Sequence, residues 1–265
     1  MRSWLETCRL CAADIREVLE QLPTRAEREP VLRVGKGGDD TTAIDHAAEQ
    51  AVVARLAALD DDFVLVSEEL GTRTFGTGGA RRVVVDPIDG SVNAKRGIPF
   101  FSFSLAVAEG PAMGDVVFGY VYDFGTGEEW TAERGRGASL GGVPLGAVSP
   151  KETIEILSFE GTTAPAIAER IGDVVGLAGR VRVMGSLALS LCHLAAGRVD
   201  AVCSLKPARS VDIAAAQLLV RECGLAIELF DDPPFGAAPL DLVPRSRVAA
   251  AGSDELVATL AAALR

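Results

Sequence analysis

The residues of this sequence that could do chemistry begin with two aspartates that follow an apolar run. In the segment VVVDPIDGSVN (83–93), Asp86 ends the run and Asp89 lies three residues further on. The run predicts a buried strand, and ligands gather at strand ends in open α/β sheets. The intervening turn would bring two carboxylates and the carbonyl oxygen of Ile88 toward one point. Such oxygen ligands suit a hard cation such as Mg²⁺, which commonly bridges protein carboxylates and phosphate groups.

The two residues after Asp89 favour a phosphate ligand. Gly90 has no side chain, which allows backbone amides at the start of a following helix to approach a phosphate, and the helix dipole favours that anion. Ser91 adds a hydroxyl group there. The structural alternative is that Asp-Gly forms an ordinary turn and that Asp86 is a cap. The segment alone does not decide between the two interpretations.

Two acids elsewhere in the chain favour the metal interpretation, although each has a structural alternative. The apolar run FVLV (63–66) is followed by SEE, so a second strand could deliver Glu68 beside Asp86 or could end in solvated acids. Asp212 stands at the start of the alanine-rich helix DIAAAQLLV, where it could also be an N-cap. Together with the first segment, these acids predict one carboxylate site.

A glycine-rich segment before another predicted helix carries a further group of polar residues, namely Lys36, Asp39, Thr42 and Asp45. They could equally be ordinary turn and cap residues. The helix itself is indicated by apolar residues at three- and four-residue intervals that continue to Ala58. Asp45 lies in its first turn.

The elements that must position these residues alternate as is typical of a layered α/β fold. Short apolar runs make the first half of the chain rich in strands. The second half alternates strands with helices, including a helix near 164–176. Segments rich in Gly and Pro predict a domain boundary near residue 150. We therefore expect an N-terminal α+β part (1–150) with most of the site acids, and a C-terminal α/β part (151–265) that supplies Asp212 and substrate contacts.

Composition limits the class of protein further. Of the 265 residues, 48% are hydrophobic and 24% are charged, as is typical of soluble globular proteins. A net charge of -11 argues against a nucleic-acid binder, because phosphate backbones are held by clustered Lys and Arg. No segment is typical of a signal peptide or a membrane span. Five cysteines, an odd number, predict reduced thiols and a cytoplasmic protein. Cys8 and Cys11 form an isolated CxxC inside a predicted helix, which favours buried thiols over a zinc or redox site.

In their order and spacing, these segments resemble the inositol monophosphatase superfamily of lithium-sensitive, Mg²⁺-dependent phosphatases, which also includes fructose-1,6-bisphosphatases. The resemblance covers most of the chain. It is carried by KGGDDTTAID (36–45), SEE (67–69), DPIDGS (86–91), GSLAL (185–189) and VDIAAA (211–216). It implies an α+β (α/β) layered fold, the αβαβα sandwich of that superfamily.

The resemblance also implies roles for individual residues. Two or three Mg²⁺ ions per site would be held by Glu68, Asp86, the carbonyl oxygen of Ile88, Asp89 and Asp212. Ser91 occupies the usual threonine position, where the hydroxyl group orients the attacking water, and Asp45 matches the acid that supports it. Glu68 acts in catalysis as well as in metal binding. Phosphate and substrate contacts are implied for Asp89, Gly90, Ser91, Gly185, Ser186, Lys206 and Arg209. Lys36 and Asp39 are candidates for a mobile loop.

The substrate is indicated by the residues around the last metal ligand. Animal inositol monophosphatases have a glutamate where this chain has Leu205, so a strict preference for inositol phosphate is not implied. Lys206 and Arg209, with Arg180 and Arg182, resemble basic positions of archaeal-type dual-specificity members and could hold a second phosphate. They could equally be solvated surface charges or be paired with local acids. The resemblance implies an enzyme that hydrolyses inositol 1-phosphate, fructose 1,6-bisphosphate or both.

Two alternatives stay open at this stage. One is a phosphatase for adenosine 3',5'-bisphosphate, and the other is a catalytically silent module that binds metal and phosphate for regulation. The resemblance further implies a homodimer, which is also the commonest symmetric assembly. As partner we expect a small phosphorylated substrate, and neither nucleic acid nor a membrane.

Overall fold

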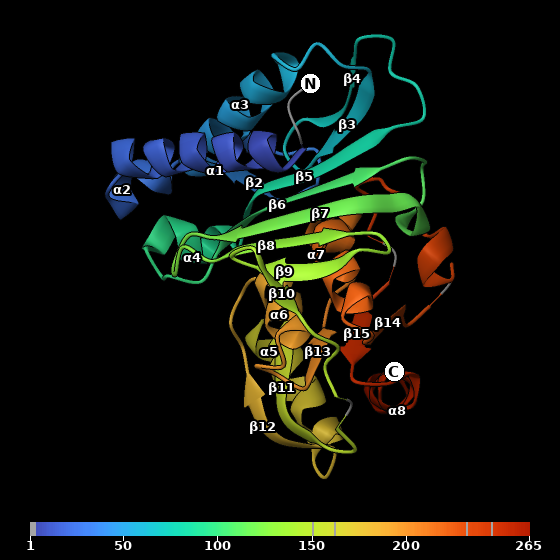
Figure 1. Cartoon of the computed structure of the whole chain (residues 1–265). Helices are drawn as coiled ribbons and strands as arrows, with labels where there is room; N and C mark the ends of the chain where they lie inside the picture. The colour runs from blue at the N-terminus through green and yellow to red at the C-terminus, as the bar shows by residue number, and fades with distance from the viewer. Residues whose placement is uncertain (1–3, 150, 162, 232, 245) are drawn as a thin grey trace.

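The computed structural model describes residues 4–149, 151–161, 163–231, 233–244 and 246–265. Helices cover the two main sheets of the molecule and also separate them (Figure 1). They comprise α1 (Trp4–Gln21), α2 (Arg25–Arg28), α3 (Ala43–Ala57), α4 (Ser91–Arg96), α5 (Ala164–Arg170), α6 (Leu187–Ala195), α7 (Ser210–Glu222) and α8 (Asp254–Leu264), with the 3-10 helices η1 (Met113–Asp115), η2 (Ile171–Val174) and η3 (Phe235–Ala237).

The strands form a large sheet, a smaller sheet and a separate hairpin. The large sheet comprises β3 (Phe63–Ser67), β4 (Gly71–Phe75), β5 (Arg82–Asp89), β6 (Ser102–Ala108), β7 (Val116–Asp123), β8 (Glu129–Glu133), β9 (Gly137–Leu140) and β10 (Val143–Leu145), in the order β10-β9-β8-β7-β6-β5-β3-β4. The smaller sheet comprises β11 (Ile154–Glu160), β12 (Ala178–Arg182), β13 (Ala201–Ser204), β14 (Ala226–Leu229) and β15 (Val248–Ala251), in the order β12-β11-β13-β15-β14. The hairpin pairs β1 (Val31–Val34) with β2 (Asp40–Thr42).

These elements stack as an αβαβα sandwich (Figure 1). Helices α1 and α3 cover one face of the large sheet, α6 and α7 lie between the two sheets, and α8 packs on the outer face of the smaller sheet. The predicted layered α+β (α/β) fold is confirmed. Within the described part of the chain, no helix is both long enough and apolar enough to cross a membrane.

The two central helices are apolar on nearly all sides because both sheets pack against them. In α7, every residue from 210 to 220 is buried except Asp212. The core between the sheets joins Val84 of the large sheet to Leu219 of α7 and to side chains of α6. The helix predicted for DIAAAQLLV is confirmed as α7, and its packing fixes the position of Asp212 in its first turn.

Strand β5 positions the site because it lies between β3 and β6 in the large sheet. It runs parallel to β3, with Ser67 opposite Val85. The next residue along each chain segment is an acid, Glu68 after Ser67 and Asp86 after Val85, so the two acids are neighbours. On the side of β6, the register shifts between Asp86 and Asp89. Such a bulge re-aims side chains at the end of a strand. The bulge therefore turns both aspartates toward the same edge of the sheet.

Two predicted boundaries, the end of a helix near residue 176 and a domain boundary near residue 150, differ in outcome. The helix predicted near 164–176 ends as an α-helix at Arg170 and continues as η2 to Val174, because Gly172 in this last turn has a low helix propensity. The boundary predicted at residue 150 lies outside the described residues. The core between the sheets takes side chains from both sides of that position, and the division into two parts stays a prediction.

Candidate active site

The candidate site is a cavity of about 350 Å³ at the carboxyl ends of β3 and β5. Its walls come from the β1–β2 hairpin, the bulge in β5, the start of α4 and the loops before α6 and α7. Most of the residues predicted from the sequence line it: Asp39, Asp45, Glu68, Asp86, Ile88, Asp89, Gly90, Ser91, Gly185, Lys206, Arg209 and Asp212. Two predicted residues lie outside this lining, namely Lys36, which is exposed on the hairpin, and Ser186, which is buried.

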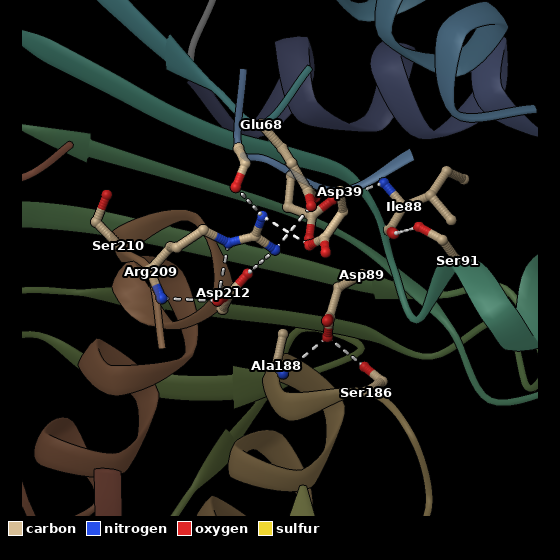
Figure 2. Close-up of polar contacts among 12 residues, drawn as sticks. Asp39, Glu68, Ile88, Asp89, Ser91, Ser186, Ala188, Arg209, Ser210 and Asp212 are labelled. Atoms are coloured by element: carbon tan, nitrogen blue, oxygen red, sulfur yellow. Dashed lines mark hydrogen bonds and ion pairs between the residues drawn. The ribbon is translucent and has the colours of Figure 1, made fainter. Parts of the chain in front are cut away.

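Asp89 is held by the beginning of α6 (Figure 2). The hydroxyl group of Ser186 donates a hydrogen bond to Oδ2 of Asp89, and the backbone amide of Ala188 donates to the same oxygen at 2.8 Å. Ser186 is also the N-cap of α6, since its Oγ accepts from the amide of Leu189 at 3.2 Å. The helix start therefore orients Asp89, although Ser186 does not reach the cavity itself.

The turn after β5 carries its own hydrogen bonds. The amide of Ile88 donates to Oδ1 of Asp86 at 2.9 Å, and Oγ of Ser91 donates to the carbonyl oxygen of Ile88 at 3.0 Å. Gly90 has a φ of 94°, and a Cβ at this position would lie 3.0 Å from the carbonyl oxygen of Gly185. Both the backbone conformation and the close approach explain why glycine occupies this position.

Burial, and after it the charges of neighbouring acids, raises the pKa values of three acids in the cavity. Desolvation, and to a lesser extent the charge of Asp212, raises the pKa of Glu68 to about 8 despite the attraction of Arg209. Desolvation raises the pKa of Asp89 to about 7, despite the hydrogen bond from Ser186. The pKa of Asp86 is raised well above its ordinary value by burial and then by Glu68. Because charged groups without a partner are costly in a buried place, these carboxylates need a cation to be stable as anions.

Asp45 has one engaged oxygen and one oxygen without a partner. Its Oδ2 accepts hydrogen bonds from the amide of Thr42 at 3.0 Å and from the hydroxyl group of Thr42 at 2.6 Å. Its Oδ1 is buried and has no hydrogen-bond partner among the described residues. The first turn of α3 therefore fixes the side chain and leaves a proton acceptor at the cavity.

Two of the four predicted basic residues, Arg209 and Lys206, lie in different surroundings. The guanidinium group of Arg209 lies among the acids, with Nη2 at 2.7 Å from Oε1 of Glu68 and at 3.2 Å from Oδ1 of Asp212 (Figure 2). Lys206 is exposed at the cavity and forms no ion pair with any described residue. Of the two, only Lys206 presents its charge to solvent.

Sequence reasoning missed Glu160, a fully buried acid in the wall of the cavity. Its carboxylate accepts hydrogen bonds from Ser158 Oγ at 2.8 Å, from Ser190 Oγ at 2.7 Å and from the amide of Gly185 at 2.8 Å. These contacts hold the loop that carries Ser186. The available signal was that Glu160 ends the apolar run IEILSF, as acids end the run FVLV.

Sequence reasoning also missed Glu49, which is fully buried on α3. It accepts hydrogen bonds from the hydroxyl group of Ser67 and from the amide of Leu70. It therefore fixes the chain on both sides of Glu68. Its spacing of four residues from Asp45 on the buried face of the helix was the signal that could have found it.

The donor set fits a hard divalent cation. Among the acids that line the cavity, the four predicted metal ligands Glu68, Asp86, Asp89 and Asp212 join the backbone carbonyl of Ile88 as oxygen donors, and burial raises the pKa of the first three. Over the described ranges, no three acidic, histidine or cysteine side chains already form a group that could hold a metal ion. The guanidinium group of Arg209 lies against two of the acids instead.

Crowded carboxylates at strand ends are typical of enzymes that use hard cations to act on phosphate groups. The profile of the inositol monophosphatase family matches residues 5–265, and the chain belongs to this family. Members of the family generally depend on Mg²⁺. Membership confirms the prediction of an enzyme of the phosphoric monoester hydrolase class.

Individual relatives point to one branch of the family. The chain is 34% identical over 223 residues to a protein of Thermococcus kodakarensis named fructose-1,6-bisphosphatase/inositol-1-monophosphatase, covering 84% of this chain and 82% of that protein. It is 31% identical over 253 residues to a protein of the same name from Archaeoglobus fulgidus, covering 94% of both. The crystal structure of an inositol monophosphatase–fructose 1,6-bisphosphatase matches with a TM-score of 0.84 at 27% identity, covering 99% of this chain and 100% of that one. The predicted similarity to archaeal-type dual-specificity members is confirmed.

Proposed function

We propose that this chain is a Mg²⁺-dependent phosphomonoesterase that hydrolyses inositol 1-phosphate, fructose 1,6-bisphosphate or both. The observation that carries the proposal is the crowding of buried carboxylates around one cavity, where Glu68, Asp86 and Asp89 all have raised pKa values. A phosphate ester would bring further negative charge to the same place. Enzyme and substrate would therefore require the same cations.

The chain's own contribution to the metal site is the position of its oxygen atoms. Two or three Mg²⁺ ions would be held by Glu68, Asp86, the carbonyl oxygen of Ile88, Asp89 and Asp212. When bound, the ions would neutralise the phosphate and lower the pKa of a water molecule. The parallel pair of β3 and β5 fixes the first two acids, and the start of α6 fixes Asp89. The backbone of Arg209 fixes Asp212 by donating to its Oδ2 at 2.7 Å.

Ser91 and Asp45 would position the attacking water. The hydroxyl group of Ser91 already donates its hydrogen to Ile88, so its lone pairs are left to accept a hydrogen bond from water. Oδ1 of Asp45 is a second acceptor at the same cavity, and a carboxylate there can hold the proton that the water loses. Glu68 is assigned to catalysis as well as to metal binding.

The substrate would be held by groups on the walls of the cavity. Gly90 and Gly185 line the space where the phosphate would lie, and Lys206 could hold a second phosphate. Leu205 packs against the core of the smaller sheet and offers no polar group to a sugar ring. A preference for bisphosphates over inositol 1-phosphate is therefore favoured by the side chains, and Arg209 could add to it.

The remaining assignments concern the surroundings of the enzyme. We keep the homodimer, the cytoplasmic location and the absence of nucleic-acid and membrane partners as predictions. The cysteines Cys8, Cys11, Cys192, Cys203 and Cys223 are free and buried, in line with the expected reduced thiols.

Phosphate release by the purified protein tests the proposal. The substrates are inositol 1-phosphate, fructose 1,6-bisphosphate and adenosine 3',5'-bisphosphate, each with Mg²⁺ and with EDTA. Turnover of either sugar substrate that EDTA abolishes supports the proposal. Turnover of the adenosine compound alone would favour a nucleotide phosphatase, and Mg²⁺ binding without turnover of any substrate would favour the silent module.

A further inference from the structure

The acids Glu68, Asp86, Asp89 and Asp212 are called the acidic cluster below. One cation already lies beside this cluster, namely the guanidinium group of Arg209 (Figure 2). In addition to its contacts with Glu68 and Asp212, its Nη1 lies 3.2 Å from Oδ2 of Asp39. The side chain of Arg209 is only 12% exposed. Charge-assisted hydrogen bonds in a place shielded from water are stronger than those of a surface pair. The guanidinium group is therefore firmly held beside the cluster.

The hairpin turn leaves space for this side chain. A Cβ at Gly37 would lie 2.5 Å from Nη1 of Arg209, and the amide of Gly37 donates to the carbonyl oxygen of Glu68 at 2.9 Å. The turn can pass this close to the guanidinium group because residue 37 has no side chain. Arg209 thus lies between the hairpin and the acids, in a place that the local sequence keeps open.

We propose that Arg209 is a built-in cation that competes with a divalent ion for Glu68 and Asp212. The inference rests on the metal site of the proposed function, because both acids are metal ligands in it. A guanidinium group at hydrogen-bond distance and a divalent ion on the same carboxylates would repel each other strongly over a few ångströms. Metal binding at these two acids therefore requires the guanidinium group to leave them.

The test measures the binding of Mn²⁺ alone by electron paramagnetic resonance, in which the signal of the free ion reports the unbound fraction. The full chain is first stripped of metal with EDTA and then transferred to buffer without chelator. The variants are Arg209→Gln and Arg209→Lys, with Lys206→Gln as the matched control. Lys206 lines the same cavity but has no ion pair among the described residues, so its variant removes the same charge without removing a contact. Thermal unfolding in EDTA verifies that each variant is folded.

We expect Arg209→Gln to bind Mn²⁺ at least about tenfold more tightly than the wild type, which corresponds to about 1.4 kcal/mol. Lys206→Gln should change the affinity by no more than about twofold, because an exposed charge acts through water and salt. Arg209→Lys should lie between the wild type and Arg209→Gln, because it keeps the charge but loses the planar fork that contacts several carboxylates at once.

Equal Mn²⁺ affinities of the wild type and both Arg209 variants would overturn the inference. A gain in Mn²⁺ affinity in Lys206→Gln as large as that in Arg209→Gln would also overturn it, because removal of any positive charge near the cavity would then have the same effect. Either result leaves the proposed function intact as long as the wild type binds Mn²⁺. If the wild type binds no Mn²⁺, the metal site of the proposed function fails, and the inference fails with it.

Discussion

Glu68 and Glu160 occur in the same sequence pattern but are stabilised in opposite ways. Each stands at the end of a buried apolar strand, Glu68 directly after β3 and Glu160 as the last residue of β11. Burial raises the pKa of both carboxyl groups. Glu160 receives hydrogen bonds from two serine hydroxyl groups and from the amide of Gly185. Glu68 faces other acids and is balanced by Arg209 alone among the described cations.

The difference lies in the donors that the fold supplies. A buried polar group is tolerated when the protein itself satisfies its hydrogen bonds, and it is costly otherwise. Glu160 is satisfied from within and serves to position the loop before α6. The acidic cluster around Glu68 lacks enough hydrogen-bond donors from the protein. Its acids are therefore stable as anions only when a cation is present. Neither burial nor a raised pKa separates the two cases, whereas the number of donors does.

The largest expected effect follows from removing one charge of the cluster. We expect Asp89→Asn to lower kcat by about a thousandfold, the scale of losing one group that stabilises charge in the transition state. The fold should stay intact, because the amide oxygen of asparagine can still accept from Ser186 and from the amide of Ala188. Phosphate release with saturating Mg²⁺ measures kcat, and circular dichroism verifies the fold.

The matched control for this variant is Asp14→Asn, which removes an acid that pairs with Arg55 at 2.7 Å outside the cavity. It should retain wild-type turnover. Full activity of Asp89→Asn would contradict the assignment of Asp89 as a metal ligand. Asp89 would then have a structural role only, like Glu160.

The next test compares the two glutamates directly. Glu160→Ala leaves several buried hydrogen-bond donors without an acceptor, so we expect it to lower the free energy of unfolding by about 3 kcal/mol. Glu68→Ala also removes repulsion between acids, and its loss should stay below about 1 kcal/mol. Urea unfolding in EDTA measures both without a contribution from metal. Equal losses would contradict the distinction between an internally satisfied acid and one that needs a cation.

Binding of Mg²⁺ should stabilise the protein through the cluster only. At a concentration of one hundred times Kd, we expect the free energy of unfolding to rise by about 2.7 kcal/mol in the wild type. Asp86→Asn should lose most of this gain, whereas Glu160→Gln should keep it because Glu160 is already satisfied. Thermal unfolding with and without Mg²⁺ gives the comparison. A gain that survives in Asp86→Asn would mean that the ion stabilises another part of the molecule.

The layered fold and most of the cavity could be predicted because they depend on local patterns. Apolar runs define β3 and β5, and the motif DPIDGS marks the turn between β5 and α4. The parallel pairing of the two strands then brings Glu68 next to Asp86. The roles of these residues in metal binding and catalysis are still predictions.

The hydrogen-bond partners of Glu160 and the position of Arg209 could not be predicted from local patterns. Glu160 owes its role to donors from Ser190 and Gly185, which lie 30 and 25 residues away in the chain. The position of Arg209 also depends on tertiary contacts, because it requires the approach of the hairpin at Gly37. In both cases the partner is set by how α6, α7 and the hairpin pack, and the sequence pattern carries no sign of it.

The smallest expected effect is the pH dependence of the metal-free protein. Burial raises the pKa of Glu68 from 4.5 to about 8, so the folded state holds a proton that the unfolded state loses above pH 4.5. The contribution of Glu68 to stability is therefore fully present at low pH and is lost as pH rises toward 8. His193 acts in the opposite direction, because burial lowers its pKa. Comparison with Glu68→Gln, which keeps His193, isolates the contribution of the acid.

We expect the wild type in EDTA to lose about 1 kcal/mol more than Glu68→Gln between pH 5 and pH 8. Saturating Mg²⁺ should abolish the difference, because the ion stabilises the anion and releases the proton. Urea unfolding at three pH values in this range, with and without Mg²⁺, measures both effects. If the wild type and the variant have the same pH dependence in EDTA, Glu68 is already an anion at neutral pH, and Arg209 alone satisfies it as fully as the internal donors satisfy Glu160.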